Sequence, residues 1–314
     1  MISVKDAAEL IELSPKRIKQ IVKEGSLEIE RGTNGVIRIP NKTMRELLVS
    51  RGARFKCRKV VIAIQKGGVG KTAITLNVAI GAAKRGYRVL IIDLDPEVCA
   101  SRFLAPDGVN LFGLSSMIEV LEKGDRVSKR AIPSRFDGVW FLPSKPKMRR
   151  IERQVGGSSP KYLLEDPMKG VEERFDLVLF DLPPAFNTIE SAAYITSDLV
   201  ICPVDEDVFS IDSFVMTMED IKAKAKEFDL DPPPIKLLRN LATSENRLSY
   251  NETYEELMKD HGDKILPFEI KQRAAVKNSI NNGQSIFDIK GEAVLKYSFS
   301  ELISYILPPC ELHS

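Results

Sequence analysis

A glycine-rich segment at residues 66–72 (KGGVGKT) constrains this chain more than any other feature of its sequence. It follows a short apolar, β-branched run at 60–64 (VVIAI) and precedes a segment whose apolar residues recur at helical spacing. A strand, a glycine loop and a helix in that order predict a phosphate-binding loop. The glycines let backbone N–H groups turn inward around a phosphate, and the helix N-terminus contributes its positive end. The alternative, a flexible glycine turn, accounts for neither the strand nor the helix.

The side chains of this loop have predicted roles. Lys71 would reach the β- and γ-phosphates of a nucleotide, and the Thr72 hydroxyl would ligate Mg²⁺. The residues expected to contact the nucleotide from the loop are Gly67, Gly68, Val69, Gly70, Lys71, Thr72 and Ala73.

Two later strands end in carboxylates. The apolar run at 89–92 (VLII) leads to Asp93 and Asp95, and the run at 177–180 (LVLF) leads to Asp181. Ligands of parallel sheets bind at the carboxyl ends of the strands, and Mg²⁺ prefers hard oxygen ligands. Asp181 therefore matches a Walker B carboxylate, which would hold a Mg²⁺-bound water and sense the γ-phosphate. For Asp93 and Asp95 the simpler alternative is that they cap a strand end.

Lys66 stands at the first position of the loop, which resembles the deviant Walker A motif of the ParA/MinD family. The resemblance implies that ATP is bound and hydrolysed to ADP in a homodimer that sandwiches the nucleotide, with Lys66 reaching the nucleotide of the partner subunit. The run DLDP at 93–96 is similar to the family's DxDPQ segment, in which Asp95 would orient the attacking water and Asp93 would act near the Mg²⁺ shell. The expected catalytic residues are Lys66, Lys71 and Asp95, and the expected metal ligands are Thr72, Asp93 and Asp181.

The resemblance also implies sites for the base of the nucleotide and for DNA. Pro203 and Asp205 are expected to border adenine and ribose, and Asn240 is expected to read the adenine. A basic segment near the C-terminus is similar to one that grips DNA nonspecifically, through Lys271, Arg273 and Lys277. The alternative there is a solvated basic helix edge. The sequence departs from the family in the switch loop, where Gln, Gly and Asn are usual but this chain has Glu97, Val98 and Cys99.

Strands alternate with helices throughout residues 58–314, which predicts a doubly wound, mainly parallel α/β sheet of the P-loop NTPase type. A helix is expected at 111–121 and a strand at 139–144. A last helix is expected over 293–307, with its apolar residues at core spacing. The apolar content of 43% is sufficient for a core of this kind.

Residues 1–52 are predicted to form a separate module. Residues 1–58 carry 13 Lys/Arg against 7 Asp/Glu, whereas the rest of the chain carries 33 against 37. The chain thus joins a basic module to a mildly acidic body, and this asymmetry favours nucleic acid as the partner of the module.

Capping signals divide this module into short helices at 3–13 and 15–25, which begin at Ser3 and Ser14. A hairpin follows, and then a third helix with Asn41 as its expected cap. The order resembles a winged helix-turn-helix of the MerR/excisionase type. The expected DNA contacts are Lys16, Arg17, Lys19 and Gln20 in the major groove, with Arg31 and Arg38 on the wing. The alternative is a dimerisation cap whose charges are solvated.

The four cysteines are far apart and no apolar run reaches membrane-spanning length, so we expect a cytoplasmic protein with reduced thiols. The resemblance implies a DNA partition ATPase, associated with the nucleoid and not with a membrane. A ParB-like centromere-binding protein would stimulate its slow ATP hydrolysis, and the N-terminal module would repress the protein's own operon. The alternative is a transcriptional regulator in which ATP only switches operator affinity.

Overall fold

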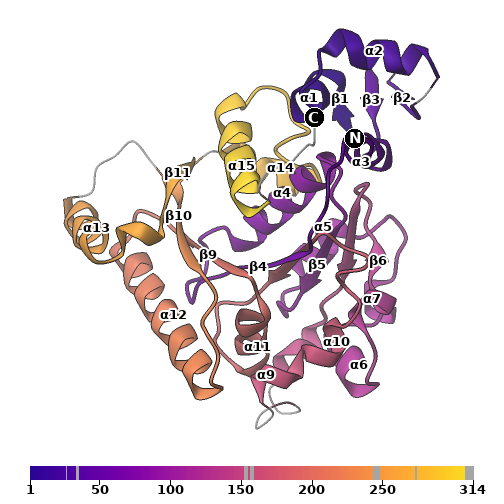
Figure 1. Cartoon of the computed structure of the whole chain (residues 1–314). Helices are drawn as coiled ribbons and strands as arrows, with labels where there is room; N and C mark the ends of the chain where they lie inside the picture. The colour runs from indigo at the N-terminus through magenta and orange to yellow at the C-terminus, as the bar shows by residue number, and fades with distance from the viewer. Residues whose placement is uncertain are drawn as a thin grey trace.

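The computed structural model describes residues 1–25, 27–32, 35–151, 155, 159–242, 248–272 and 274–307. Its centre is an eight-stranded sheet with helices on both faces, and a small N-terminal module lies at one end of the body (Figure 1). The strands are β4 (Arg58–Ile62), β5 (Val89–Asp93), β6 (Ile132–Pro133), β7 (Val139–Leu142), β8 (Leu177–Asp181), β9 (Leu199–Val204), β10 (Ile235–Ala242) and β11 (Ile265–Lys271).

The strand order is β11-β10-β9-β4-β8-β5-β7-β6, and the neighbouring strands are parallel except for β6 with β7. The central strands are short, almost wholly apolar and buried along their whole length, as in β5, β8 and β9. Such continuous apolar runs are typical of strands that helices cover on both faces. The prediction of a doubly wound, mainly parallel sheet is confirmed.

Two helical layers cover the sheet, and each has its own apolar core (Figure 1). On one face lie α4 (Lys71–Lys84), α5 (Cys99–Leu104), α14 (Ala274–Asn281) and α15 (Ala293–Ile306). On the other face lie α6 (Met117–Glu122), α7 (Val127–Arg130), α9 (Pro160–Leu163), α10 (Glu165–Met168), α11 (Thr188–Thr196), α12 (Val208–Glu227) and α13 (Leu248–His261).

The helix expected at 111–121 is wrong in its extent. Residues 111–113 form a short 3₁₀ turn, and α6 begins only at Met117. The reason is local: Ser116 and Glu119 form a reciprocal capping box, which satisfies backbone N–H groups at the helix start. The strand expected at 139–144 is present as β7, and the last helix is present as α15.

A close approach between α4 and α15 depends on Gly81. A Cβ atom at this position would overlap the side chains of Ile303 and Phe287. The absence of that atom lets α15 lie directly against α4, the helix that follows the glycine loop. The C-terminal helix is therefore part of the layer that supports the loop.

The N-terminal module contains β1 (Ile2–Ser3), α1 (Val4–Leu10), α2 (Pro15–Lys23), β2 (Glu30–Arg31), β3 (Ile37–Ile39) and α3 (Asn41–Ser50). Its strands form a small antiparallel sheet in the order β1-β3-β2, packed with the helices around an apolar core of their own. The Ser3 hydroxyl accepts a hydrogen bond from the Asp6 N–H, and the Ser14 hydroxyl accepts one from the Arg17 N–H. Both predicted helix starts are confirmed.

The expected cap of the third helix is wrong. Pro40 is the N-cap of α3, and Asn41 is its first helical residue. The Asn41 side chain instead reaches the body, where it donates hydrogen bonds to the carbonyl oxygens of Ala83 and Tyr87. The cap position therefore lies one residue earlier than predicted, and the asparagine contacts a distant part of the chain.

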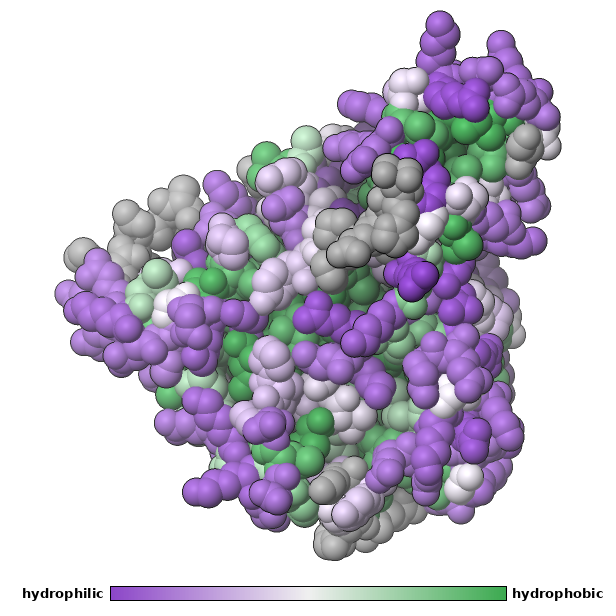
Figure 2. Space-filling view, viewed as in Figure 1, coloured by the Kyte–Doolittle hydropathy of each residue, from purple (hydrophilic) through white to green (hydrophobic). Residues whose placement is uncertain are grey.

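The face of the molecule drawn in the space-filling view (Figure 2) is largely polar. Hydrophilic residues dominate the view in Figure 2, and apolar residues appear mainly in small areas between them. None of the helices in the described ranges combines the length and the apolar character needed to cross a membrane.

Candidate active site

The glycine loop connects β4 to α4 and presents its backbone at the carboxyl edge of the sheet. Gly68 and Gly70 adopt positive φ angles of 79° and 82°, and Gly70 is the N-cap of α4. Side-chain-bearing residues rarely adopt this left-handed conformation, so the glycines set the path of the loop. The loop thereby ends at the N-terminus of a 14-residue helix, which is a favourable place for an anion.

The Lys71 side chain lies against the backbone of the glycine loop. Its Nζ donates a hydrogen bond to the carbonyl oxygen of Lys66 at 2.7 Å, and the residue is buried. Burial lowers the pKa of the Lys71 ammonium, and the nearby charge of Asp181 opposes this shift. A poorly solvated ammonium on a loop of N–H donors is suited to bind a phosphate.

Thr72 and Asp181 converge from two elements that are far apart in the sequence. The Thr72 hydroxyl donates to Asp181 Oδ2 at 3.0 Å, and the Thr75 hydroxyl lies 3.5 Å from Oδ1. Burial, followed by the adjacent charge of Asp93, raises the pKa of Asp181 well above its usual value. These residues fit a hard divalent cation. It would relieve the repulsion between the Asp93 and Asp181 carboxylates, and it would accept the Thr72 and Asp181 oxygens as ligands.

Asp93 lies beside Asp181 in the register of β5 and β8, but its own oxygens are engaged. Oδ1 accepts the Asp95 N–H at 3.0 Å, and Oδ2 accepts the Ser101 N–H at 2.9 Å and the Ser101 hydroxyl at 2.6 Å. Burial raises the pKa of Asp93 to about 7. The sequence reading missed Ser101, whose only signal is its place two residues after Cys99 in the switch loop.

The switch loop after β5 contains a backbone conformation that suits glycine. Val98 has φ +63° and ψ +20° and is fully buried, at the position where the resembling family has Gly. A β-branched residue in this region is a true conformational outlier. Asp95, just before it, is half-buried and accepts the Glu97 N–H at 2.8 Å, and burial raises its pKa.

Lys66 is held by ion pairs within the chain. Its ammonium pairs with Asp205 at 3.1 Å and with Asp207 at 2.9 Å. Burial disfavours the charge, but the hydrogen bonds to Asp207 and Asp205 outweigh it and raise the pKa of Lys66. The structure thus brings Asp205 to the glycine loop as an ion-pair partner, and Asp207, the N-cap of α12, joins it.

Asn240 lies against the glycine loop. Its side-chain amide is buried and donates to the Val69 carbonyl at 2.7 Å. A Cβ atom on Gly70 would stand 2.8 Å from Asn240 Nδ2, so the glycine makes room for this contact. Pro203 is buried within β9, next to β10 in the sheet. Of the residues expected around adenine, Asp205 and Asn240 thus contact the glycine loop, and Pro203 lies within the neighbouring strand β9.

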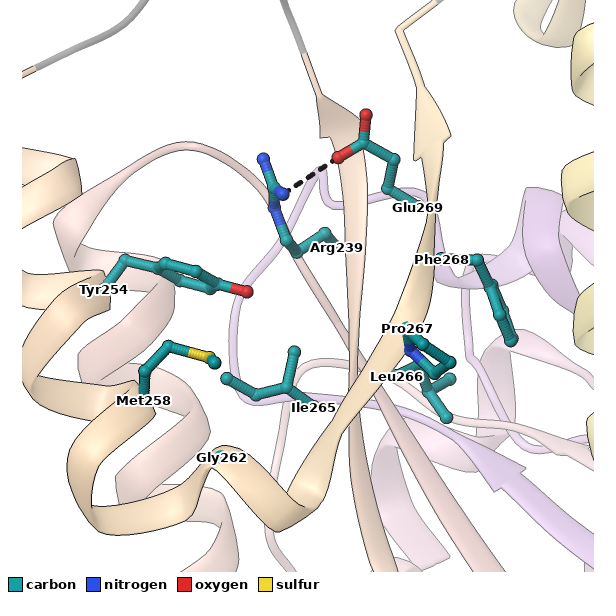
Figure 3. Close-up of a pocket in the computed structure, with 9 residues that line it drawn as sticks. All are labelled: Arg239, Tyr254, Met258, Gly262, Ile265, Leu266, Pro267, Phe268 and Glu269. Atoms are coloured by element: carbon teal, nitrogen blue, oxygen red, sulfur yellow. Dashed lines mark ion pairs between the residues drawn. The ribbon is translucent and has the colours of Figure 1, made fainter.

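A separate cavity of about 400 Å³ lies on the other side of β10, between β11 and α13 (Figure 3). Arg239 pairs there with Glu269 at 3.0 Å, and its guanidinium lies 5.3 Å from the ring centroid of Tyr254. Successive residues of a strand point to opposite faces, so Arg239 faces this cavity while Asn240 faces the loop. The residues that line the cavity include none of those predicted for the nucleotide.

Four of the predicted DNA contacts of the N-terminal module lie on α2, and two lie on the strands β2 and β3. Every one of the four side chains on α2 is exposed, and so are those of Arg31 and Arg38. Two of them meet an acidic neighbour: Gln20 donates to Glu24 at 2.8 Å, and Arg17 lies 4.0 Å from the same carboxylate. At the other end of the chain Lys271 and Lys277 are exposed, and Arg273 lies outside the described residues.

The buried carboxylates make stability depend on pH in the nucleotide-free protein. Asp93 and Asp181 have raised pKa values when folded and ordinary values near 3.8 when unfolded, so the folded state binds more protons between about pH 4 and pH 7. The free energy of unfolding should therefore fall as the pH rises through this window. We expect a melting temperature several degrees lower at about pH 7.5 than at about pH 5.5, measured by calorimetry without nucleotide.

The control for this prediction is the protein with Mg²⁺ and nucleotide, in which the difference should shrink because a cation stabilises the ionised carboxylates. A melting temperature that is higher at about pH 7.5 than at about pH 5.5 would contradict the prediction that ionised Asp93 and Asp181 destabilise the nucleotide-free fold.

Comparison with known proteins gives a consistent set of similarities. Residues 57–230 match a family model described as an AAA domain. The cell division protein PomZ of Myxococcus xanthus is 24% identical over 98% of this chain and 92% of its own length. The chromosome-partitioning ATPase Soj of Thermus thermophilus is 26% identical over 74% of this chain and 88% of its own. The solved complex of a Cyanothece McdA variant with ATP superposes with a TM-score of 0.72 at 18% identity, covering 83% of this chain and all of that one.

Proposed function

This chain belongs to the AAA domain family, and from that membership and the geometry of its glycine loop we propose that it is a ParA-type DNA partition ATPase that hydrolyses ATP to ADP with Mg²⁺. The observation that carries the proposal is the convergence of Lys71, Thr72 and Asp181 at the N-terminus of α4. This arrangement combines a phosphate-binding cation with two hard oxygen ligands, as phosphoryl transfer requires.

Each residue of the proposed site has one task. The loop N–H groups and Lys71 bind the phosphates, and Thr72 and Asp181 would hold Mg²⁺, which neutralises phosphate charge when bound. Asp95, on the switch loop, would orient the attacking water. Asp93 would act near the Mg²⁺ shell, where Ser101 fixes its orientation through two hydrogen bonds.

The proposal includes an ATP-sandwich homodimer. Lys66 would reach the partner's nucleotide only after it leaves Asp205 and Asp207. Partly exposed ion pairs contribute about 0.2–1 kcal/mol each, so this release costs little compared with binding a triphosphate. The pairs therefore hold Lys66 in the monomer without preventing dimerisation. Pro203, Asp205 and Asn240 would border the base.

DNA binding by two surfaces completes the proposed cycle. In the dimer Lys271, Arg273 and Lys277 would contact duplex phosphates without reading sequence. The N-terminal module would act as a winged helix-turn-helix that binds an operator through α2. The name of the relative Soj supports a partition role, and a ParB-like protein would stimulate hydrolysis at the nucleoid in the cytoplasm. The rival proposal is a transcriptional regulator, which the exposed basic face of α2 equally supports.

Replacing Lys66 tests the dimer. We expect Lys66→Ala to bind a fluorescent ATP analogue as tightly as the wild type but to remain a monomer with ATP, because Lys71 and the loop N–H groups are intact. Sedimentation analysis with and without ATP measures the dimer fraction. Asp207→Asn is the matched variant: it removes one partner of Lys66, keeps a side chain that can cap α12, and should favour the dimer. An ATP-dependent dimer of Lys66→Ala would refute the trans role.

A further inference from the structure

A cavity of about 660 Å³ lies between the N-terminal module and the body. On the module side it is lined by residues of β1, α1 and β3, and on the body side by the last turn of α4, by Phe287 and by one face of α15. Figure 1 shows β1 and α1 beside α15 and the end of α4. The residues that line this cavity include none of those predicted for the nucleotide, so it is a separate site.

Apolar side chains from both parts line the cavity. The module contributes Ile2, Leu10 and Val36, and the body contributes Phe287 and Tyr297. Two of them remain open to solvent, because Val36 is 53% exposed and Tyr297 is 65% exposed. Removing such surface from water is favourable. The cavity therefore offers an apolar surface that a ligand with an apolar group could cover.

Two cations on the body side have only neutral partners. The Arg85 guanidinium donates to the Ser304 hydroxyl at 3.1 Å and to the Ser300 carbonyl oxygen at 3.2 Å. The Lys296 ammonium donates to the Ile289 carbonyl oxygen at 2.5 Å. Within the ranges that the structure describes, neither cation forms an ion pair with a carboxylate. Both can therefore bind an anion without breaking an ion pair.

The neighbouring Lys84 shows the contrasting case. Its ammonium pairs with Asp288 at 2.7 Å, so its charge is already neutralised. Arg85 is half-buried like Lys84 but lacks such a partner, and burial lowers the pKa of its guanidinium. A poorly solvated charge without a charged partner is unfavourable. An anion beside Arg85 would replace the solvation that this side chain has lost.

The carboxylates of the cavity lie mostly on the module side. Asp6 and Glu9 are exposed on α1, and Asp6 also accepts the Ser3 hydroxyl at 2.7 Å. Glu301 is half-buried on α15. The cavity is thus polarised, with Arg85 and its neighbouring lysines on the body side and hydrated carboxylates on the module side. This arrangement directs the charged end of an anionic ligand toward the body.

We propose that this cavity binds a small organic anion, a compact apolar or aromatic group that carries one carboxylate or a group of similar charge. The anionic end would accept hydrogen bonds from Arg85 and Lys296, and the apolar end would lie between Tyr297 and the apolar side chains of the module. A ligand in this place contacts both parts of the chain and would stabilise their association. The proposal does not depend on nucleotide binding or hydrolysis.

Fluorescence titration of the full chain with anilinonaphthalene sulfonate, an aromatic anion, tests the chemical class of the ligand. ADP and Mg²⁺ are included so that the glycine loop is occupied. Competition then uses three compounds of nearly equal size: benzoate, benzyl alcohol and benzylammonium. Benzoate should displace the dye, whereas the uncharged alcohol and the cation should not. Equal displacement by all three compounds, or none by benzoate, would overturn the proposal.

Two variants place the binding in this cavity. Arg85→Gln should weaken the binding of the dye and of benzoate by about tenfold or more, because it removes a hydrogen bond to a charged group. Ser300→Phe keeps Arg85 but puts a ring into the cavity, and it should abolish binding. The melting temperature of each variant shows whether it is folded, and the second variant tests the site even if the first is unstable.

Lys290→Gln is the matched control, because it removes an exposed cation that lies in the same part of the chain but does not line the cavity. It should bind the dye as the wild type does. Wild-type affinity in both Arg85→Gln and Ser300→Phe would place the dye elsewhere and refute the site. An equal loss of affinity in Lys290→Gln and Arg85→Gln would show that the dye senses only the general surface charge, and this result would refute the site as well.

Discussion

Lys71→Ala is expected to abolish ATP-dependent binding of this protein to random-sequence duplex DNA. The Lys71 ammonium is buried in the glycine loop, and it is the only lysine whose Nζ bonds to the backbone of that loop among the residues described. Without it the phosphates lose their principal cation, so ATP hydrolysis should fall by about a hundredfold or more, as when a preorganised electrostatic stabiliser is removed. The dimer and its phosphate-binding surface should then fail to form.

The measurement is DNA binding by fluorescence anisotropy with ATP, with ADP and without nucleotide, at two salt concentrations. For the wild type we expect binding with ATP alone, weakened steeply by salt because the contacts are to phosphates. Lys222→Ala, which alters an exposed lysine of α12, is the control and should retain binding. Binding that needs no nucleotide, survives in Lys71→Ala and is confined to one promoter sequence would instead favour the transcriptional regulator.

Asp181→Asn is expected to have two opposite effects, a loss of activity and a gain in stability. The carboxylate is fully buried beside Asp93, and both pKa values are raised, so ionising the pair destabilises the nucleotide-free fold at neutral pH. An asparagine removes one of the charges, keeps an oxygen for the Thr72 hydroxyl, and lowers the affinity for Mg²⁺. Hydrolysis should fall by about a hundredfold or more, while the melting temperature without nucleotide should rise.

Calorimetry and a phosphate-release assay on the same preparation measure both effects. Asp198→Asn serves as the control, because Asp198 accepts the Lys59 N–H at the opposite edge of the sheet and should leave hydrolysis unchanged. A variant that is less stable than the wild type at neutral pH would show that Asp181 is ionised and well paired in the nucleotide-free protein. A variant that hydrolyses ATP at the wild-type rate would remove Asp181 from the proposed metal site.

Local rules explain which parts of the site are visible in the sequence. A glycine loop needs its glycines at fixed spacing, and a buried parallel strand needs a continuous apolar run, so the loop and Asp181 follow from short segments. The same holds for the caps at Ser3 and Ser14, which depend on residues three positions away. These features require no knowledge of the rest of the chain.

Contacts between distant segments were not predictable in this way. Asn41 looks like a helix cap because asparagine is a good one, yet its amide bonds to carbonyl groups more than forty residues away. The pairing of Lys66 with Asp205 and Asp207 likewise depends on how α12 follows β9 in space. The hydrogen bonds from Ser101 to Asp93 require the switch loop to turn back, which a sequence motif does not reveal.

Val98 gives the switch loop a measurable preference between conformations. A left-handed backbone costs a residue other than glycine about 1–2 kcal/mol, and a β-branched side chain has no local hydrogen bond to offset it. This cost corresponds to a factor of about 5–30 in the ratio of two populations. Any rearrangement that returns Val98 to an ordinary conformation is favoured by that factor, which a glycine would not supply. The switch loop positions Asp95 and Ser101. Its observed conformation would thus be less stable, relative to other conformations of the loop, than the same conformation with a glycine at position 98.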